Sequence, residues 1–312
     1  MELIRGLHNL RSRHRGCVAT IGNFDGVHLG HQTVLGQLAN KGAERGLPTQ
    51  VIIFEPLPRE YFAGAKSPAR LTRFREKVLA LQRFSVDRLL CMQFDRKLAH
   101  MAPDEFVNRI LVEGLAVNYL VVGDDFRYGR GRVGDFGSLE QAGRRYGFDV
   151  AHMHTFEIDG SRVSSTRIRK ALEIGDLSAA EKLLGRPYRM SGKVMHGDKR
   201  GRTIGFPTAN IRLARQVSPV NGVYAVEAYG LDREPLPGVA NVGRRPTVGG
   251  IEQRLEVHLF DFDQDIYQRH VDVEFQRKLR EEMRFDSLDA LTRQITADVD
   301  AAKSYFGERT RR

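Results

Sequence analysis

The sequence predicts an α/β chain in two domains: a doubly wound parallel-sheet domain, then an antiparallel β-barrel domain with a C-terminal helix. Short apolar runs alternate with helix-like stretches through the first half, as in βαβ units. Further on, strands of alternating apolar and polar residues lie between Gly and Pro. We place the boundary at Gly185-Arg186-Pro187, which gives domains 1–185 and 186–312.

The first domain is predicted from apolar runs short enough for a buried parallel sheet. The expected strands are 17–21, 50–54, 88–94, 119–123 and 148–153. Stretches at helical period lie between them at 31–45, 72–84 and 103–113, and two more run from about 164 to 184. In such sheets, ligands bind at the carboxyl ends of the strands.

The second domain is predicted from alternating strands such as 222–229 and 254–260, which form a barrel or a sandwich. We take the barrel as the expected fold. One apolar stripe at three- and four-residue spacing then predicts a single amphipathic helix packed on it. The stripe consists of Leu288, Leu291, Ile295, Val299, Ala302 and Phe306.

Composition narrows the class of protein. With 312 residues, 41% of them hydrophobic and 28% charged, the chain is globular rather than disordered. It contains no run of about 18 apolar residues and no apolar N-terminal segment, so we expect a cytoplasmic protein that does not span a membrane. Cys17 and Cys91 form no CxxC pair, which argues against a disulfide framework and against structural zinc.

The formal charge of +10 comes from 49 Lys+Arg against 39 Asp+Glu, and most of the basic residues are Arg. The planar guanidinium suits phosphate recognition, so we expect phosphorylated partners. Charge alone leaves two classes open: a nucleotide enzyme and a basic RNA-binding or tRNA-acting protein.

The first chemical motif, Gly22-Asn23-Phe24-Asp25-Gly26-Val27-His28-Leu29-Gly30-His31, follows the first predicted strand. A strand-to-helix turn directs free N–H groups and the positive helix end at an anion. His28 and His31 can donate hydrogen bonds to phosphate oxygens, and Gly30 lets a ligand approach the backbone. The HxGH pattern therefore indicates nucleotidyl transfer, although class I aminoacyl-tRNA synthetases carry a similar motif.

A second motif opens a predicted helix and consists of Ser164, Ser165, Thr166, Arg167, Ile168 and Arg169. Hydroxyls at a helix N-terminus, with guanidinium groups one turn further, can bind the same triphosphate. The alternative reading is an ordinary helix cap with solvated arginines.

Three other patterns are read as coincidences. Residues 189–193 (Arg-Met-Ser-Gly-Lys) resemble a KMSKS loop but run straight into a predicted strand. Residues 129–134 fit GxGxxG, but no apolar strand leads into them and Asp135-Phe136-Gly137 is expected to break the helix, so we predict a loop lining the site. His152 and His154 have no thiol or carboxylate set for a metal.

The second domain carries a Gly-rich basic segment at 192–210. We expect a flap over polyphosphate, formed by Gly197, Lys199, Gly201, Arg202, Gly205 and Pro207. Thr208 and Asn210 lie two apart, so in an extended segment both offer neutral oxygens on one face to Mg²⁺. On the strand 254–260, Glu256 lies on the polar face and could take the proton from an attacking hydroxyl. The alternative reading of the Gly-rich segment is a surface hairpin with a basic tip, and that of Glu256 is an exposed strand residue.

With these motifs together and in this order, residues 14–306 resemble the prokaryotic bifunctional riboflavin kinase/FAD synthetase family. The resemblance rests on residues 22–31, 123–129 and 164–169 in the first half, and on 192–210, 241–247, Glu256 and 279–285 in the second. It implies that the first domain transfers AMP from ATP to FMN and that the second phosphorylates riboflavin. The implied ligands are ATP, Mg²⁺, riboflavin, FMN and FAD, with no specific nucleic acid.

The resemblance also implies roles for single residues. His28, His31, Ser165 and Arg169 would hold the phosphates of the adenylyl donor, with Asn23 nearby. Asp125, Phe126 and Arg280 would lie toward the flavin. Thr208 and Asn210 would hold Mg-ATP, and Glu256 would be the kinase base. Two positions depart from the family pattern: Leu57 stands where His is frequent, and Val163 where Ile is frequent.

Overall fold

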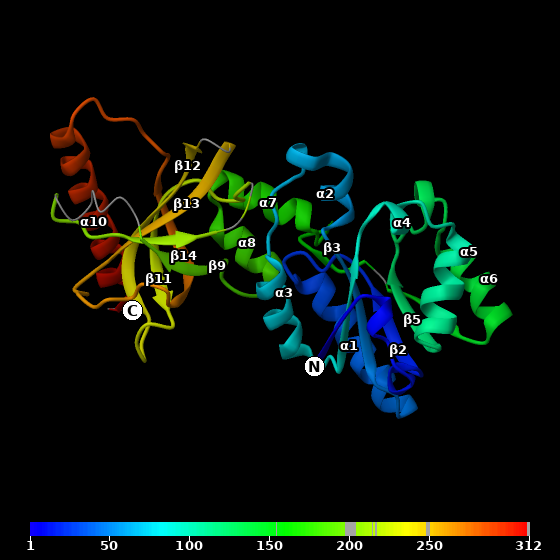
Figure 1. Cartoon of the computed structure of the whole chain (residues 1–312). Coiled ribbons are helices and arrows are strands. Elements are labelled where there is room, and N and C mark those ends of the chain that lie inside the picture. Colours follow the sequence, from blue (N-terminus) through cyan, green and yellow to red (C-terminus); the bar gives the residue numbers. More distant parts are fainter. Residues whose placement is uncertain (154, 197–203, 214, 216, 248–249, 311–312) are drawn as a thin grey trace. The chain divides into compact units, whose positions relative to one another are not determined.

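The computed structural model describes residues 1–153, 155–196, 204–213, 215, 217–247 and 250–310 (Figure 1). The chain forms two compact units. Unit 1 consists of Met1–Pro68 and Thr72–Ser164, and unit 2 consists of Ala69–Leu71 and Ser165–Arg312. Each unit is described by itself.

Unit 1 contains a six-stranded sheet in the order β1-β4-β3-β2-β5-β6, and every neighbouring pair in it is parallel. Its strands are β1 (Glu2–Arg5), β2 (Cys17–Ile21), β3 (Thr49–Glu55), β4 (Arg88–Gln93), β5 (Val117–Gly123) and β6 (Asp149–Met153). Its helices are α1 (Leu29–Arg45), α2 (Pro58–Ala63), α3 (Phe74–Leu81), α4 (Arg96–Ala99), α5 (Pro103–Phe106), the π-helix η5 (Val107–Gly114) and α6 (Phe136–Tyr146). A hairpin of β7 (Glu157–Ile158) and β8 (Ser161–Arg162) follows.

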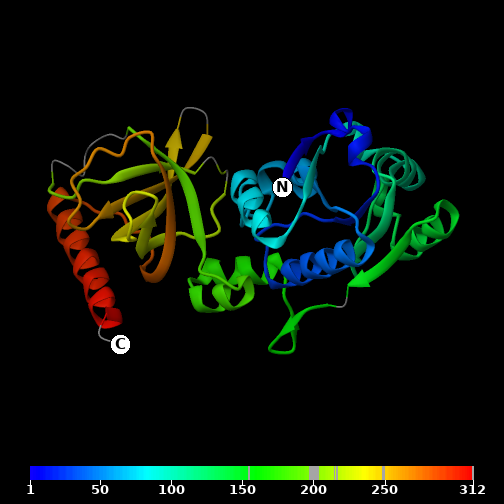
Figure 2. The ribbon, with the colours of Figure 1, turned by 90° about the horizontal axis from the view of Figure 1, so that it is seen from below.

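Both faces of this sheet are covered by helices, which explains why its inner strands, β2 to β5, are mostly apolar and buried. One core joins the sheet to η5 and α6 through residues such as Ile110 and Leu139. The other core joins it to α1 and α3 through residues such as Leu35 and Leu81. Figure 2 shows α1 lying along one face of the sheet.

Unit 2 is a closed antiparallel barrel in the order β10-β13-β12-β11-β14-β9. Its strands are β9 (Arg189–Met195), β10 (Ala209–Arg212), β11 (Gly222–Tyr229), β12 (Leu236–Thr247), β13 (Gly250–Leu259) and β14 (His270–Arg280). Its helices are α7 (Ser165–Ile174), α8 (Leu177–Leu184) and α10 (Leu288–Thr310). Val299 and Ala302 of α10 pack on Val223, Ala225 and Val239 of the barrel, so this helix covers part of the barrel's outer surface (Figure 2).

The predicted fold class is confirmed, with three local differences. The strand β1 was not predicted, because three of its four residues are exposed and no apolar run marks it. Asp135-Phe136-Gly137 does not break a helix: the Asp135 carboxylate accepts a hydrogen bond from Ser138 N–H and caps the start of α6. The helices α7 and α8, predicted as the end of the first domain, group with the barrel in unit 2.

Within the described residues, no helix is long and apolar enough to cross a membrane.

Candidate active sites

The first site lies where the strand order of unit 1 reverses. The chain proceeds from β2 to β3 and β4 on one side, while β5 and β6 lie on the other. Ligands of open α/β sheets bind at the carboxyl ends of the strands at such a point. The motif at 22–31 begins where β2 ends, and the motif at 123–129 begins at the end of β5, with which β2 pairs. The topology therefore brings these two predicted motifs to one edge.

A buried carboxylate holds the loop between β2 and α1. Asp25 is 2% exposed and accepts hydrogen bonds from the N–H (3.0 Å) and the hydroxyl (3.3 Å) of Thr72. It also pairs with Arg59 at 2.5 Å. The Thr72 hydroxyl in turn accepts from the N–H of Gly26 at 2.9 Å. The loop is thus fixed through Asp25 and Gly26 to a segment nearly fifty residues away in sequence.

A buried lysine fixes the same loop from α3. Lys77 is fully buried and donates to the carbonyl of Asn23 at 2.6 Å. The loop needs this support because Phe24 (φ 48°) and Val27 (φ 42°) adopt the left-handed region, which side chains other than Gly occupy at a cost of about 1–3 kcal/mol each. The contacts made by Lys77, Thr72 and Arg59 offset that strain.

The two imidazoles of HxGH are stacked. The rings of His28 and His31 have centroids 3.7 Å apart at 17°, and Phe24 lies 4.9 Å from His31. His28 caps α1, because its Nδ1 accepts from the His31 N–H at 3.3 Å. Its proton therefore sits on Nε2, which can donate to a ligand.

His31 is neutral at physiological pH. Burial, followed by the neighbouring His28, holds the pKa of His31 well below its usual range. Its buried Nδ1 has no hydrogen-bond partner among the described residues. A buried polar atom without a partner is rare and is typical of a binding or catalytic site. The imidazole pair can thus supply neutral N–H donors to a phosphate.

The β5 motif and the end of unit 1 meet beside this loop. Arg162 donates to Asp125 at 2.7 Å. Partial burial tends to raise the pKa of the Asp125 carboxyl, but this guanidinium outweighs burial and holds the pKa below its usual range. A Cβ on Gly30 would lie 3.3 Å from the His28 ring and 3.6 Å from the carbonyl of Val163, so Gly keeps the approach open.

The predicted helix start at 164–169 is confirmed as a helix start, since α7 begins at Ser165. Ser164 is the last residue of unit 1, one residue beyond Val163, while Ser165, Thr166, Arg167 and Arg169 belong to unit 2. Arg169 donates through Nε to the carbonyl of Ala69 at 2.6 Å, so part of its guanidinium serves unit 2 itself.

The patterns read as coincidences have these places in the structure. Residues 189–193 form part of strand β9. Residues 129–134 form a loop before α6, and its two ends are joined by backbone hydrogen bonds between Tyr128 and Gly134. His152 stacks on Phe136 and lies 3.4 Å from Asp124, while His154 is outside the described residues. Those residues contain no cluster of three or more His, Cys, Asp or Glu that could hold a metal.

The second site is a row of polar residues across three strands of the barrel. Asn210 of β10 lies directly opposite Glu256 of β13, and Glu256 lies directly opposite Asn241 of β12. Residues in the adjacent register, Ile211, Leu255 and Val242, are buried inside the barrel. Because side chains alternate along a strand, the polar row Asn210-Glu256-Asn241 lies on the outer face.

The segment before β10 is fixed to the same face. His258, two residues beyond Glu256, donates through Nδ1 to the carbonyl of Pro207 at 2.8 Å. The ring of Phe206 meets His258 edge to face at 5.5 Å. These contacts hold Pro207 and Thr208 beside the row. Gly197, Lys199, Gly201 and Arg202 of the predicted flap lie outside the described residues, whereas Gly205 is described, with φ 83°.

Glu256 is partly exposed and keeps its carboxylate accessible. Its side chain is 34% exposed, and Arg254 on the same strand face lies 3.6 Å from it. Cross-strand neighbours have Cβ atoms about 4.5–5.5 Å apart, so Glu256 is within reach of groups held by Asn210 and by Asn241. This arrangement can hold a proton acceptor between two amides.

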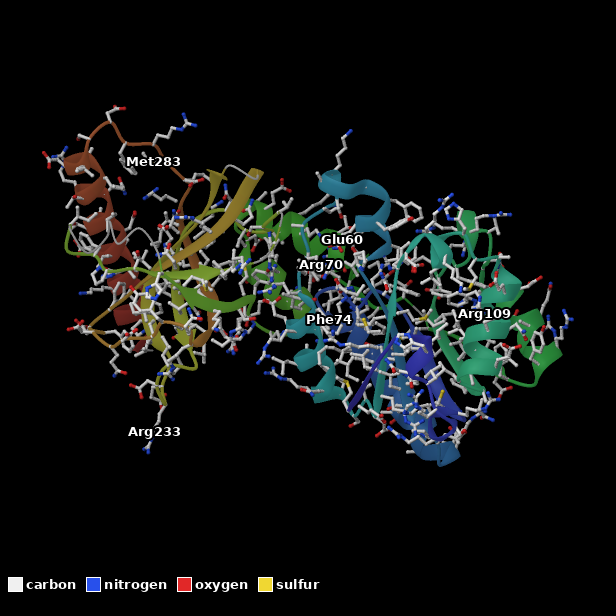
Figure 3. All side chains as sticks on the ribbon, in the orientation of Figure 1. Glu60, Arg70, Phe74, Arg109, Arg233 and Met283 are labelled. Carbon is white, nitrogen blue, oxygen red and sulfur yellow. The ribbon has the colours of Figure 1, made fainter. Side chains whose placement is uncertain are left out.

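The coil between β14 and α10 reaches this face. Its Glu282 carboxylate contacts Gly243 at the position where a Cβ would stand. Met283, labelled in Figure 3, lies on the same coil, at the end of the barrel away from the turn that carries Arg233. Arg280, predicted to lie toward the flavin, makes a two-pronged ion pair with the buried Asp298 of α10, at 2.9 and 2.7 Å. Its guanidinium anchors the helix.

Sequence reasoning missed several residues of these sites. Asp25 lies inside the first motif, yet nothing in its spacing shows that Thr72, Arg59 and Lys77 surround the loop. Asn241 lies inside a segment that the family resemblance covers, but no role was assigned to it. Only the register of β12 against β13 indicates a role for Asn241, because it places this outward-facing amide directly opposite Glu256.

The fold and the two sites define a chain with two separate nucleotide- and phosphate-handling centres, one on a doubly wound sheet and one on a barrel. Family models match both parts in this order: FAD synthetase over residues 10–167 and riboflavin kinase over residues 184–306. The chain belongs to the bifunctional riboflavin kinase/FMN adenylyltransferase family.

Individual relatives carry the same family name. The bifunctional riboflavin kinase/FMN adenylyltransferase of Escherichia coli (strain K12) is 55% identical over 98% of both chains. That of Haemophilus influenzae is 53% identical over 98% of this chain and 99% of its own. A crystal structure described as a macrolide-efflux protein from Streptococcus pneumoniae is 31% identical, with a TM-score of 0.80 over 96% of this chain and 97% of the other. From that structure we take the fold alone.

Proposed function

We propose that this chain converts riboflavin to FAD in two ATP-dependent steps. Residues of the barrel unit phosphorylate riboflavin to FMN, and residues at the switch point of unit 1 transfer AMP from ATP to FMN, releasing pyrophosphate. The observation that carries this proposal is the pair of family matches in chain order, each over a unit that presents its own phosphate-binding motifs.

In the adenylyl transfer, the protein positions the reactants and neutralises developing charge, because such transfers need little covalent help. His28 donates from Nε2, and the neutral His31 donates from its single ring N–H, toward the phosphates of ATP. Gly30 and Asn23 lie in the same motif. Asp125 and Phe126 lie toward the flavin. Ser164, Ser165, Thr166, Arg167 and Arg169 are kept as phosphate ligands on the sequence pattern alone. The described geometry of the His28–His31 pair supports these roles.

In the kinase step, Glu256 accepts the proton of the ribityl hydroxyl that attacks the terminal phosphate of ATP. By the family resemblance, Gly205 and Pro207 would bind the polyphosphate, together with Gly197, Lys199, Gly201 and Arg202, which lie outside the described residues. A partly exposed carboxylate at the centre of a polar row supports the role of Glu256. We propose that Arg280 serves the flavin end through the coil that follows it, since its guanidinium is engaged with Asp298.

Mg²⁺ fits the residues present. Thr208 and Asn210 supply a hydroxyl and an amide oxygen, which are the hard neutral ligands that Mg²⁺ accepts while keeping most of its waters. Asn210 lies directly opposite Glu256, so a bound ion would be close to the reacting phosphate. When bound, the ion neutralises charge on the ATP phosphates.

We further propose a cytoplasmic location and no specific nucleic-acid partner. ATP is the nucleotide that both reactions require, and two phosphate sites account for the arginine-rich composition. The RNA-binding alternative has no motif in its favour beyond HxGH, which the FAD synthetase match covers.

The test is incubation of the full chain with riboflavin, ATP and Mg²⁺, followed by chromatography. FMN should appear first and FAD later, and omission of Mg²⁺ should stop both. The variant Asp272→Asn serves as a control substitution, because Asp272 is exposed on β14, a strand outside the polar row. It should form FMN and FAD at the wild-type rates. Failure to form FMN from riboflavin would overturn the proposal.

A further inference from the structure

We propose that Asn241 is a substrate-binding residue of the kinase site: its side-chain oxygen accepts a hydrogen bond from a ribityl hydroxyl next to the one that attacks. This inference rests on the proposed function, and it specifies the order in which the two substrates lie across the strands of the barrel. The phosphoryl donor lies over β10, the base lies in the centre on β13, and the polyol acceptor lies over β12.

The first support is the state of the Asn241 amide. Its Oδ1 is buried and has no hydrogen-bond partner among the described residues. Nearly all buried polar atoms in native proteins are paired, so an orphaned one calls for an explanation. An amide oxygen accepts hydrogen bonds only, so the missing partner is a donor such as a hydroxyl, or a cation.

The second support is the register of the strands. Ala240 and Val242 are fully buried inside the barrel, so Asn241 projects from the outer face. It lies directly opposite Glu256, whose other neighbour is Asn210. A substrate whose hydroxyl loses its proton to Glu256 therefore presents its adjacent carbons to one of these two amides.

The third support decides between a hydroxyl and the metal. Mg²⁺ in nucleotide sites uses one or two protein ligands together with phosphates and waters. Thr208 and Asn210 already supply two oxygens on the β10 side, and β12 lies two strands away, about 9–10 Å in the hydrogen-bonding direction. The acceptor substrate is a polyol, whose successive hydroxyls are donors. Asn241 is therefore assigned to the polyol.

What surrounds Asn241 is consistent with an occupied face. Val223, its partner on the other side, is covered by α10 in an apolar cluster. Gly243, two residues further along the same outer face, is covered by the Glu282 carboxylate. The polyol is thus bordered by apolar packing on one side and by the 281–287 coil on the other.

The test compares Asn241→Leu, which keeps the volume but removes the acceptor, with Asn221→Ala, an exposed amide of the same unit, as matched control. In the full chain, kcat/KM for riboflavin should fall about 10–100-fold in Asn241→Leu, the span of one hydrogen bond to substrate. KM for ATP and the Mg²⁺ dependence should stay within twofold. A cooperative melting transition of the barrel unit near the wild-type temperature shows that the variant is folded, and FAD formation from supplied FMN, which uses unit 1, should be unchanged.

A substrate analogue makes the assignment specific. With 4′-deoxyriboflavin, which lacks the hydroxyl adjacent to the attacking one, wild type and Asn241→Leu should turn over at similar rates. In Asn241→Asp an acceptor oxygen remains at the same place, so kcat/KM for riboflavin should stay above that of Asn241→Leu, and 4′-deoxyriboflavin should remain the poorer substrate. This second variant reports on the contact even if Asn241→Leu folds poorly.

Three results would overturn the inference: an unchanged kcat/KM for riboflavin in Asn241→Leu, an equal loss with riboflavin and with 4′-deoxyriboflavin, or a rise in the Mg²⁺ requirement that assigns Asn241 to the metal. The proposed function is judged separately, because wild type and Asn221→Ala must form FMN whatever Asn241 does. Absence of FMN in those two would defeat the function itself.

Discussion

Thr72→Val removes one hydroxyl from the contacts that hold the loop between β2 and α1, and it leaves the side-chain shape almost unchanged. Thr72 is 7% exposed, and its hydroxyl accepts from Gly26 N–H at 2.9 Å and donates to the buried Asp25 at 3.3 Å. The substitution tests whether this contact positions His28 and His31, which follow Gly26 within five residues.

The expected magnitude follows from the two bonds. A backbone hydrogen bond contributes about 0.5–1.5 kcal/mol and a bond to a charged group about 1.5–3 kcal/mol. Because the Asp25 bond is long, we expect a loss near the lower end, about 2 kcal/mol. For a unit of this size that is about 4–8 °C in melting temperature. A shift of the loop by a fraction of an ångström should lower adenylyl transfer by about 10–100-fold.

The assay is FAD formation from supplied FMN and ATP, measured beside FMN formation from riboflavin in the same preparation. FAD formation should fall and FMN formation should remain at the wild-type rate. Thr33→Val is the matched control, because among the described residues the Thr33 hydroxyl donates to the Leu29 carbonyl, one turn back in α1, and takes no part in the contacts of Asp25. If Thr72→Val melts with wild type and forms FAD within a few-fold of it, the loop is positioned by other contacts and the reasoning fails.

Four further predictions concern the two sites and the units. Glu256→Gln should lower riboflavin phosphorylation by about 10²–10⁴ without weakening ATP binding, measured by steady-state kinetics and equilibrium dialysis; a collapse of Mg-ATP affinity instead would make the carboxylate a metal ligand. His31→Ala should lower FAD formation by about 10²–10³ and spare FMN formation. The pKa of His31 in the folded protein lies below its unfolded value of about 6.5, so the folded state loses stability as the pH falls below 6.5. In His31→Gln, the free energy of unfolding should therefore depend less steeply on pH between pH 7 and pH 5 than in wild type. An equal dependence in the two proteins would contradict this. Residues 165–312 should phosphorylate riboflavin and melt at a higher temperature than residues 186–312, because α8 packs against β14; equal melting temperatures would show that α8 adds nothing.

Much of the first unit could be predicted because its signals are local. Buried parallel strands are apolar along their whole length, so the runs at β2 to β6 stand out. The strand β1 does not, since only Ile4 is buried there and pairing with β4 is what makes it a strand. The cap at Asp135 was misjudged for a similar reason: Asp followed by Phe and Gly is typical of a turn, and the Ser138 N–H that makes it a helix start is three residues away.

The sites could be predicted as sets of residues but not as arrangements. His28 and His31 are close in sequence, so their proximity follows from spacing. The placing of Asn210 opposite Glu256 and of Glu256 opposite Asn241 follows from the register of strands up to 46 residues apart, which barrel closure determines. The role of Arg280 could not be predicted correctly from the family pattern alone. Its guanidinium donates to Asp298 on α10, eighteen residues later, and nothing in the pattern indicates this ion pair.

Ala69–Leu71 belongs to the barrel unit although the chain on both sides belongs to unit 1. Tyr188 donates to the Leu71 carbonyl and Arg215 to the Arg70 carbonyl, at 3.1 and 2.8 Å, and both donors are buried. Their acceptors are therefore encoded in the first quarter of the gene. A chimera that joins residues 1–164 of one relative to the remainder of another inherits these three residues from the wrong parent. Recombination between relatives should succeed most often when residues 69–71 are exchanged together with the C-terminal half.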